Sequence, residues 1–135
     1  MENKIHVLVV DDEQYITKLV ERTLKDAGYA VTVANDGISA LRMLAEKEPD
    51  LVLLDIRMPG LDGFQVLERI RDSSEVPVLM LTAVHETTAL AHSLGLGAND
   101  YIEKPFLPRV LIARIQAKLR RAKGYVAINS KTDWI

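Results

Sequence analysis

The sequence predicts an α/β fold, a doubly wound parallel sheet of five strands with helices on both faces. Three observations lead to this prediction. Short apolar runs alternate with amphipathic stretches five times along the 135 residues. The connections between them are short, and most of the apolar runs lack the alternation of a sheet with one wet face. Strands joined in this way run parallel, through right-handed crossovers.

The first two strand–helix units lie before Pro49. The first strand is apolar without alternation, as expected when both faces are buried. The helix after it repeats apolar residues at helical spacing from Ile16 and ends at Gly28. The second strand alternates as an edge strand does, and turn and capping residues 35–37 precede the second helix. The strands are Ile5–Val10 and Tyr29–Ala34, and the helical stripes are Ile16–Ala27 and Ile38–Ala45.

The remaining three units follow Pro49. The third strand is apolar and ends at Asp55. Pro77 opens the fourth strand, where its missing N–H is tolerated. The fourth helix has the poorest apolar stripe because it is rich in Thr and Ala, and Pro108 suits the first turn of the last helix. The strands are Leu51–Leu54, Val78–Leu81 and Asp100–Glu103, and the helices are the stripe Phe64–Ile70, about 86–94, and Pro108–Ala122.

Composition narrows the class of protein. A net charge of −2 with 48% hydrophobic residues is ordinary for a globular domain. No apolar run approaches the ~20 residues of a membrane span, and the N-terminus lacks a signal-peptide pattern. The absence of cysteine excludes disulfides and thiolate metal sites. The basic residues between Lys118 and Lys123 suit the end of a helix. We therefore expect a cytoplasmic domain that itself binds neither nucleic acid nor membrane.

Reactive polar residues end four of the five predicted strands. They are Asp11 and Asp12 after the first strand, Asp55 after the third, Thr82 after the fourth and Lys104 after the fifth. Ligands bind at the carboxyl edge of such a sheet, so we expect these side chains to converge. Clustered carboxylates repel unless a cation compensates, and oxygen ligands favour Mg²⁺. Such a site suits a phosphoryl group, which a carboxylate can accept as an aspartyl phosphate.

Four blocks of the chain resemble the signature blocks of the response-regulator receiver family, in family order and spacing. The resemblance implies a flavodoxin-like or CheY-like three-layer sandwich with strand order 2-1-3-4-5. It implies a receiver domain over residues 4–123, with 124–135 as a linker towards a missing output domain or a tail. The blocks are Val7–Glu13, Asp50–Gly63, Leu81–Ala83 and Tyr101–Phe106.

The resemblance assigns a phosphoacceptor and a metal site. It implies that Asp55 takes a phosphoryl group from the phosphohistidine of a sensor histidine kinase. It implies a Mg²⁺ site in which Asp12 binds the metal directly, Asp11 supports it through water, and Asp55 and the backbone carbonyl of Arg57 complete the protein ligands. The family positions of Arg57 and Val84 flank the path of the attacking water, so we predict that both residues tune the lifetime of the phosphoryl group.

The resemblance also implies a switch. Thr82 and Lys104 contact the phosphoryl group, and a cis bond before Pro105 aims the Lys104 ammonium inward. Thr82 and Tyr101 then couple phosphorylation to the face made by the fourth helix, fifth strand and last helix, with a coupling of order 1–3 kcal/mol. That face controls an output, for which transcription is the prediction.

The end of the chain most resembles winged-helix regulators of the OmpR/PhoB type. In that subfamily charged pairs across the same face form a symmetric dimer, and Asp100 and Arg114 match one such pair. Four other positions carry no charge where the subfamily usually has one. The alternatives are therefore a homodimer through this face, a more apolar contact, or no stable dimer. The four positions are Leu90, Gly95, Val110 and Gln116.

Each feature alone has a structural explanation. Asp11 and Asp12 can cap a helix, Asp55 can form a turn, and Lys104 can be a surface lysine. A Mg²⁺-dependent phosphohydrolase would carry two aspartates two residues apart after the first strand. A flavin module would need a Ser/Thr/Gly phosphate loop there, and a degenerate receiver would lack site residues. We therefore predict a signalling domain, not an enzyme, which catalyses only its own phosphorylation and dephosphorylation.

Overall fold

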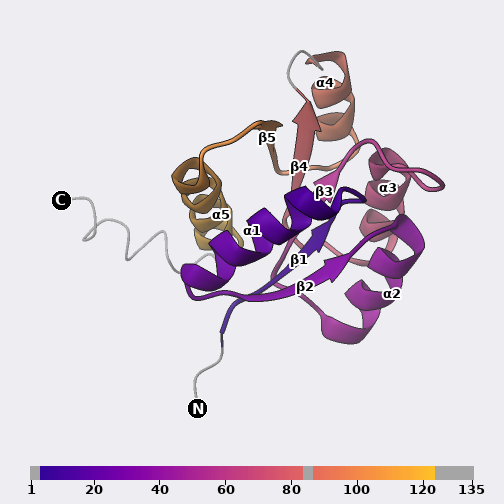
Figure 1. The fold of residues 1–135 in the computed structure, drawn as a ribbon. Helices are drawn as coiled ribbons and strands as arrows, with labels where there is room; N and C mark the ends of the chain where they lie inside the picture. The colour runs from indigo at the N-terminus through magenta and orange to yellow at the C-terminus, as the bar shows by residue number, and fades with distance from the viewer. Residues whose placement is uncertain (1–3, 84–86, 124–135) are drawn as a thin grey trace.

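Five strands alternate with five helices along the chain (Figure 1), as the sequence predicts. The computed structural model describes residues 4–83 and 87–123. The strands are β1 (His6–Val10), β2 (Ala30–Ala34), β3 (Leu51–Asp55), β4 (Val78–Ala83) and β5 (Asp100–Lys104). The helices are α1 (Gln14–Asp26), α2 (Gly37–Lys47), α3 (Gly63–Ser73), α4 (Thr87–Gly95) and α5 (Pro108–Lys123). Among the described residues, no helix combines the length and apolar character needed to cross a membrane.

The strands form one parallel sheet in the order β2-β1-β3-β4-β5, which confirms the predicted fold. The order reverses between β1 and β3, where a doubly wound sheet binds its ligands. β3 is the central strand, paired with β1 on one side and β4 on the other. Asp55, the last residue of β3, therefore lies in the middle of the carboxyl edge.

Two apolar cores flank the sheet because successive strand residues point to opposite faces. Val7 and Val9 of β1 enter the first core with residues of α1 and α5, while Leu8 and Val10 enter the second with residues of α2 and α3. Figure 1 shows α1 and α5 on one side of the sheet and α2 and α3 on the other. Nearly every residue of the three central strands is buried, which makes the sheet a rigid platform.

The strands run further than the apolar runs predict, and the difference concerns the site. Asp55 closes β3, β4 continues through Thr82, and β5 includes Lys104. Asp55 pairs with Leu81 in the register of the sheet, and the amide of Ile56 donates to the Leu81 carbonyl at 3.2 Å. Asp55, Thr82 and Lys104 are therefore part of the sheet, which fixes their backbone positions, whereas Asp11 and Asp12 follow directly after β1.

The start of α3 is built against the backbone of Asp55. Asp62 caps the helix by accepting from the Gln65 amide at 2.9 Å, and the Gln65 side chain accepts from the Asp62 amide, a capping box. A Cβ at Gly63 would collide with the Asp55 carbonyl and lie 2.7 Å from Cα of Ile56. Only glycine fits between the helix and the end of β3, so the Asp-Gly pair of this loop has a packing reason.

Candidate functional site

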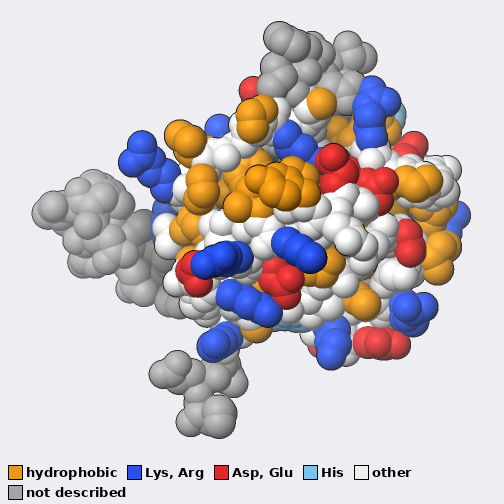
Figure 2. Space-filling model, viewed as in Figure 1, with side chains coloured by type: hydrophobic (Ala, Val, Ile, Leu, Met, Phe, Trp, Pro, Cys, Tyr) orange, Lys and Arg blue, Asp and Glu red, His pale blue; other side chains and the backbone are white. Residues whose placement is uncertain are grey.

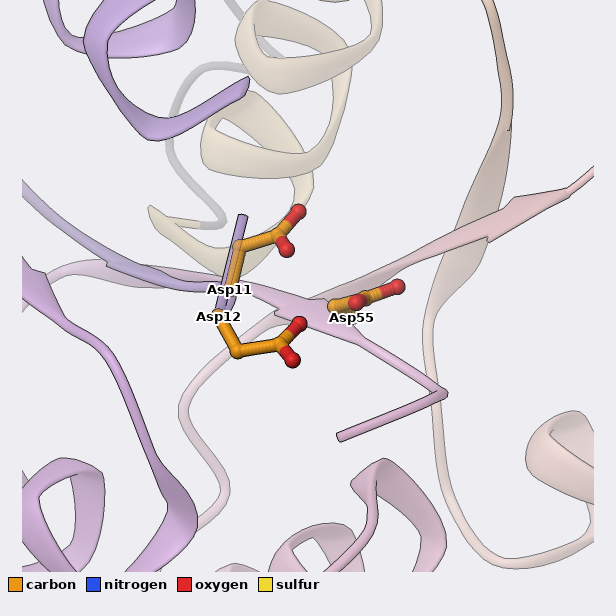
Figure 3. A group of neighbouring side chains, drawn as sticks. All are labelled: Asp11, Asp12 and Asp55. Atoms are coloured by element: carbon orange, nitrogen blue, oxygen red, sulfur yellow. The ribbon is translucent and has the colours of Figure 1, made fainter. Parts of the chain in front are cut away.

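Three carboxylates gather at the carboxyl edge of the sheet (Figure 3), which is the convergence the strand ends predict. Asp11 and Asp12 follow β1, and Asp55 ends the neighbouring β3. One oxygen from each side chain lies within 4.8 Å of the others. Asp11 and Asp55 are buried, at 0% and 6% exposed, whereas Asp12 is open to solvent. Three negative charges at this spacing repel strongly in a partly dry site.

Lys104 supplies a cation to this cluster from the end of β5. Its Nζ donates to Asp11 Oδ2 at 3.0 Å and to Asp55 Oδ1 at 3.1 Å, and it pairs with Glu13 Oε1 at 3.5 Å. The Lys104–Pro105 bond is cis, the isomer that the resemblance implies. One ammonium therefore faces several carboxylates, and the site keeps a surplus of negative charge.

Both oxygens of Asp11 already have protein donors. Oδ1 accepts from the Glu13 amide at 3.0 Å, and Oδ2 accepts from Lys104. The N-cap residue of α1 is Glu13, and no side chain caps this helix end. Helix capping therefore does not explain the positions of Asp11 and Asp12 at the start of α1. Of the three carboxylates, Asp12 and Asp55 have the more available oxygens for a direct metal bond, while Asp11 suits an indirect role.

Burial and the surplus of negative charge change the pKa values of Asp55 and Lys104. Burial raises the pKa of Asp55 first, and Asp11 raises it further, against the opposing effect of Lys104, to about 7. Burial by itself would lower the pKa of Lys104, but Asp55 and Asp11 outweigh it and leave that pKa raised. Both groups hold protons more firmly than usual, as expected where negative charge exceeds positive charge. A divalent cation would relieve this excess.

The donor set fits Mg²⁺. Carboxylate oxygens are the ligands that this hard cation takes, one or two of them, with water completing the shell. Among the described residues, Asp11, Asp12 and Asp55 form a group that could hold a metal ion. Arg57, whose carbonyl the resemblance adds as a ligand, lies two residues beyond Asp55 with an exposed side chain.

Thr82 and Tyr101, the predicted switch pair, lie on adjacent strands and on the same face of the sheet. Thr82 is buried, and its hydroxyl donates to the Ala83 carbonyl at 3.3 Å. Tyr101 pairs with Met80 in the register, two residues before Thr82, and packs half-buried against the second core. Arg114 lies 5.8 Å from the centre of the Tyr101 ring.

Some expectations lie outside the described residues. Val84, predicted to tune the phosphoryl lifetime, is one, and so are residues 124–135 and the side chain of Leu90. Asp100 and Arg114, which match a pair that crosses the dimer in the subfamily, form an ion pair within one chain at 3.1 Å. Lys118 lies 3.7 Å from the same carboxylate.

Sequence reasoning gave no role to Glu13, although the structure places it beside Lys104. The available signal was its position directly after the aspartate pair, at the start of a helix on the carboxyl edge. An acidic residue is also favoured at the start of a helix by the helix dipole. The sequence therefore could not distinguish a role in the site from a role in the helix.

Comparisons with known proteins agree with this geometry. The sequence pattern of the response regulator receiver domain matches residues 7–116. The chain is 49% identical over 121 residues to "Probable transcriptional regulator ycf27" of Guillardia theta, which covers 90% of this chain and 48% of that protein. This chain therefore spans about half the length of that relative.

Solved structures give the same result. The receiver domain of NtrX from Brucella abortus is 38% identical, with a TM-score of 0.81, over 84% of this chain and 98% of that one. The BeF₃-activated N-terminal receiver domain of RstA from Klebsiella pneumoniae is 35% identical, with a TM-score of 0.82, over 85% and 98%. The family pattern covers well over half of the sequence. The strand order β2-β1-β3-β4-β5 is the order that the resemblance to this family implies. This chain belongs to the response regulator receiver domain family.

Proposed function

We propose that this domain is a phosphorylation-activated switch in which Asp55 accepts a phosphoryl group from a sensor histidine kinase in the presence of Mg²⁺. The observation that carries the proposal is the cluster at the carboxyl edge. Asp11, Asp12 and Asp55 lie within 4.8 Å of one another, and Lys104 bridges Asp11 and Asp55. An anionic site with one cation and a surplus of oxygen ligands suits a metal-bound phosphoryl group.

In this mechanism an oxygen of Asp55 attacks phosphorus in line with the bond to the phosphohistidine nitrogen. That bond breaks, and the protonated ring leaves as neutral imidazole with the electron pair. The Lys104 ammonium moves from the Asp55 carboxylate to a phosphoryl oxygen. The Thr82 hydroxyl leaves the Ala83 carbonyl and donates to a second phosphoryl oxygen instead. When bound, Mg²⁺ held by Asp12 and Asp55, with Asp11 in support and the Arg57 carbonyl as a further ligand, would neutralise charge on the phosphoryl oxygens.

The output of the switch is a change at the surface made by α4, β5 and α5. Thr82 and Tyr101 share one face of neighbouring strands, so a shift of the threonine towards a phosphoryl group opens space on the side where the ring packs. The relative named as a transcriptional regulator favours transcription as the output. The activation of the RstA receiver by BeF₃ favours the same kind of trigger. A homodimer through this surface belongs to the proposal.

The proposal extends to the organisation of the chain. We place the receiver domain at residues 4–123 and assign 124–135 to a linker towards an output domain.

The domain turns over no external phosphoester; it forms and hydrolyses only its own aspartyl phosphate. Incubation with a small aromatic phosphomonoester tests this point, since steady release of the phenol would instead indicate a phosphohydrolase.

The decisive experiment is incubation with acetyl phosphate and Mg²⁺, followed by intact mass spectrometry. We expect a single phosphoryl adduct on the wild type and none on Asp55→Asn. Asp36→Asn is the matched control, because Asp36 caps α2 near the same edge of the sheet and asparagine caps equally well. An adduct on Asp55→Asn, or none on the wild type with Mg²⁺ present, would contradict the proposal.

A further inference from the structure

A fourth carboxylate reaches the site from the first residue before α1. Glu13 Oε1 lies 3.5 Å from Lys104 Nζ, and the Glu13 side chain is 62% exposed while that of Lys104 is 16% exposed. In the space-filling view acidic side chains gather near the start of α1 (Figure 2). Glu13 therefore lies on the solvent side of the ammonium, where an incoming phosphodonor meets the site.

The contact has no evident structural purpose. Glu13 is the N-cap residue of α1, but its side chain makes no capping hydrogen bond there. The backbone amide of Glu13, which any residue provides, makes the bond to Asp11. A long contact from an exposed glutamate adds little to stability. The fold thus places a negative charge against the cation that the reaction uses, without depending on it.

We propose that Glu13 is a positioning residue, acting through Lys104, that slows phosphorylation by free, highly charged phosphodonors; this rests on the function proposed above. The glutamate neutralises part of the ammonium charge and repels anions approaching Asp55. A docked kinase offsets that repulsion with contacts elsewhere, whereas a small donor has only its phosphoryl group. Glu13 therefore favours delivery of the phosphoryl group by a protein partner.

The reaction that this repulsion slows is the transfer of a phosphoryl group from acetyl phosphate to Asp55. An oxygen of the Asp55 carboxylate forms a bond to the phosphorus of acetyl phosphate, the bond from phosphorus to the acetyl oxygen breaks, and acetate leaves with the electron pair. No proton is required. The donor arrives as a dianion near neutral pH, so its approach meets the Glu13 charge in full. Phosphoramidate, which is largely a monoanion at that pH, meets about half of the repulsion.

The test compares wild type and Glu13→Gln with both donors in the presence of Mg²⁺, following adduct formation by intact mass. At low ionic strength we expect the second-order rate constant with acetyl phosphate to rise about five-fold and that with phosphoramidate about two-fold. Both gains should largely disappear in ~1 M salt, where screening is strong. A change in the fold alone would alter both donors equally and would not respond to salt in this way.

Glu103→Gln is the matched control, because it removes one exposed negative charge at the end of β5. We expect its rates with both donors to match those of the wild type. Unchanged rates for Glu13→Gln with a reactive wild type would overturn the inference on Glu13 and leave the proposed function standing. Equal gains with both donors at every salt concentration would overturn it too. Failure of the wild type to form any adduct would instead reject the proposed function.

Discussion

Arg71 and Lys104 are each held by several partners, and the partners of the two cations differ in kind. Arg71 of α3 donates to the carbonyl of Gly97 at 3.0 Å, that of Ser74 at 3.2 Å and the side-chain oxygen of Asn99 at 2.9 Å. The same Asn99 oxygen accepts from the Val78 amide at 2.8 Å. Every one of these acceptors is neutral. The Arg71 cluster therefore joins α3, the segment after α4 and the start of β4.

Lys104 has the opposite environment, since the three side chains around it are all carboxylates. Burial lowers the pKa of Arg71, with Glu75 opposing, whereas the surplus of acids raises the pKa of Lys104. The Arg71 guanidinium has neutral hydrogen-bond acceptors and no surplus of negative charge among them. The Lys104 cluster carries more negative charge than its one ammonium can neutralise, and the proposed binding of a cation and a phosphoryl group rests on this imbalance.

Replacing Lys104 gives the largest expected effect. Lys104→Met removes the cation, so we expect phosphorylation by acetyl phosphate to slow by about 100-fold, the usual loss when a group that stabilises developing charge is removed. The free energy of unfolding without metal should fall by about 3 kcal/mol, because buried carboxylates lose their partner. Adduct formation and urea unfolding measure the two effects.

Lys47→Met, at an exposed position near the end of α2, is the control for the Lys104 variant. It should match the wild type in both measurements. A Lys104→Met protein that is phosphorylated at the wild-type rate would show that the imbalance of charge does not mark a reactive site.

Replacing Arg71 should affect stability alone. Arg71→Met leaves several carbonyl oxygens without their donor, so we expect the free energy of unfolding to fall by about 2 kcal/mol. The rate of adduct formation and the Mg²⁺ concentration it requires should stay unchanged. Arg69→Met, an exposed arginine on the same helix, is the control. An altered Mg²⁺ requirement in Arg71→Met would mean that the two clusters are not independent.

The pH dependence of stability sharpens the contrast. The folded state raises the Asp55 pKa from 3.8 to about 7. The stability linked to this proton is therefore full below about pH 4 and lost as pH rises through 7 without a divalent cation. Relative to Asp55→Asn, we expect the wild type to lose about 2 kcal/mol between pH 5 and 8. Mg²⁺ at pH 8 should raise the Tm of the wild type and not that of the variant; parallel pH curves would refute this.

The smallest expected effect concerns the lifetime of the phosphoryl group. Arg57 follows the acceptor by two residues, and its side chain is exposed. In the proposed role, Arg57 flanks the path of the attacking water; Arg57→Ala removes that bulk, so we expect dephosphorylation to quicken about three-fold, or ~0.7 kcal/mol in activation free energy. The adduct should still form in full. The decay of the isolated phosphoprotein measures this rate. A decay equal to that of the wild type would show that Arg57 does not affect the lifetime of the phosphoryl group.

The sequence predicted the fold and the convergence of the acidic residues, because buried parallel strands leave a strong apolar pattern and their polar ends must meet at one edge. It placed Lys104 just after the fifth strand, whereas β5 includes Lys104, since hydrogen-bonded pairing extends beyond the predicted strand. It also did not predict the Glu13 contact or the Arg71 cluster. Both join residues far apart in the chain through long side chains, and periodicity carries no information about such contacts.

The ion pair between Arg114 and Asp100 bears on how two copies of this domain would associate. The pair is already formed within one chain, at 3.1 Å. A symmetric assembly that uses the same two residues would trade each internal pair for one with its neighbour, so the number of ion pairs stays constant. Such a swap selects the correct alignment of the copies but contributes little to their dissociation constant. In the proposed dimer, most of the binding free energy would therefore come from other contacts, for which the exposed apolar side chains of Leu107 and Val110 are candidates.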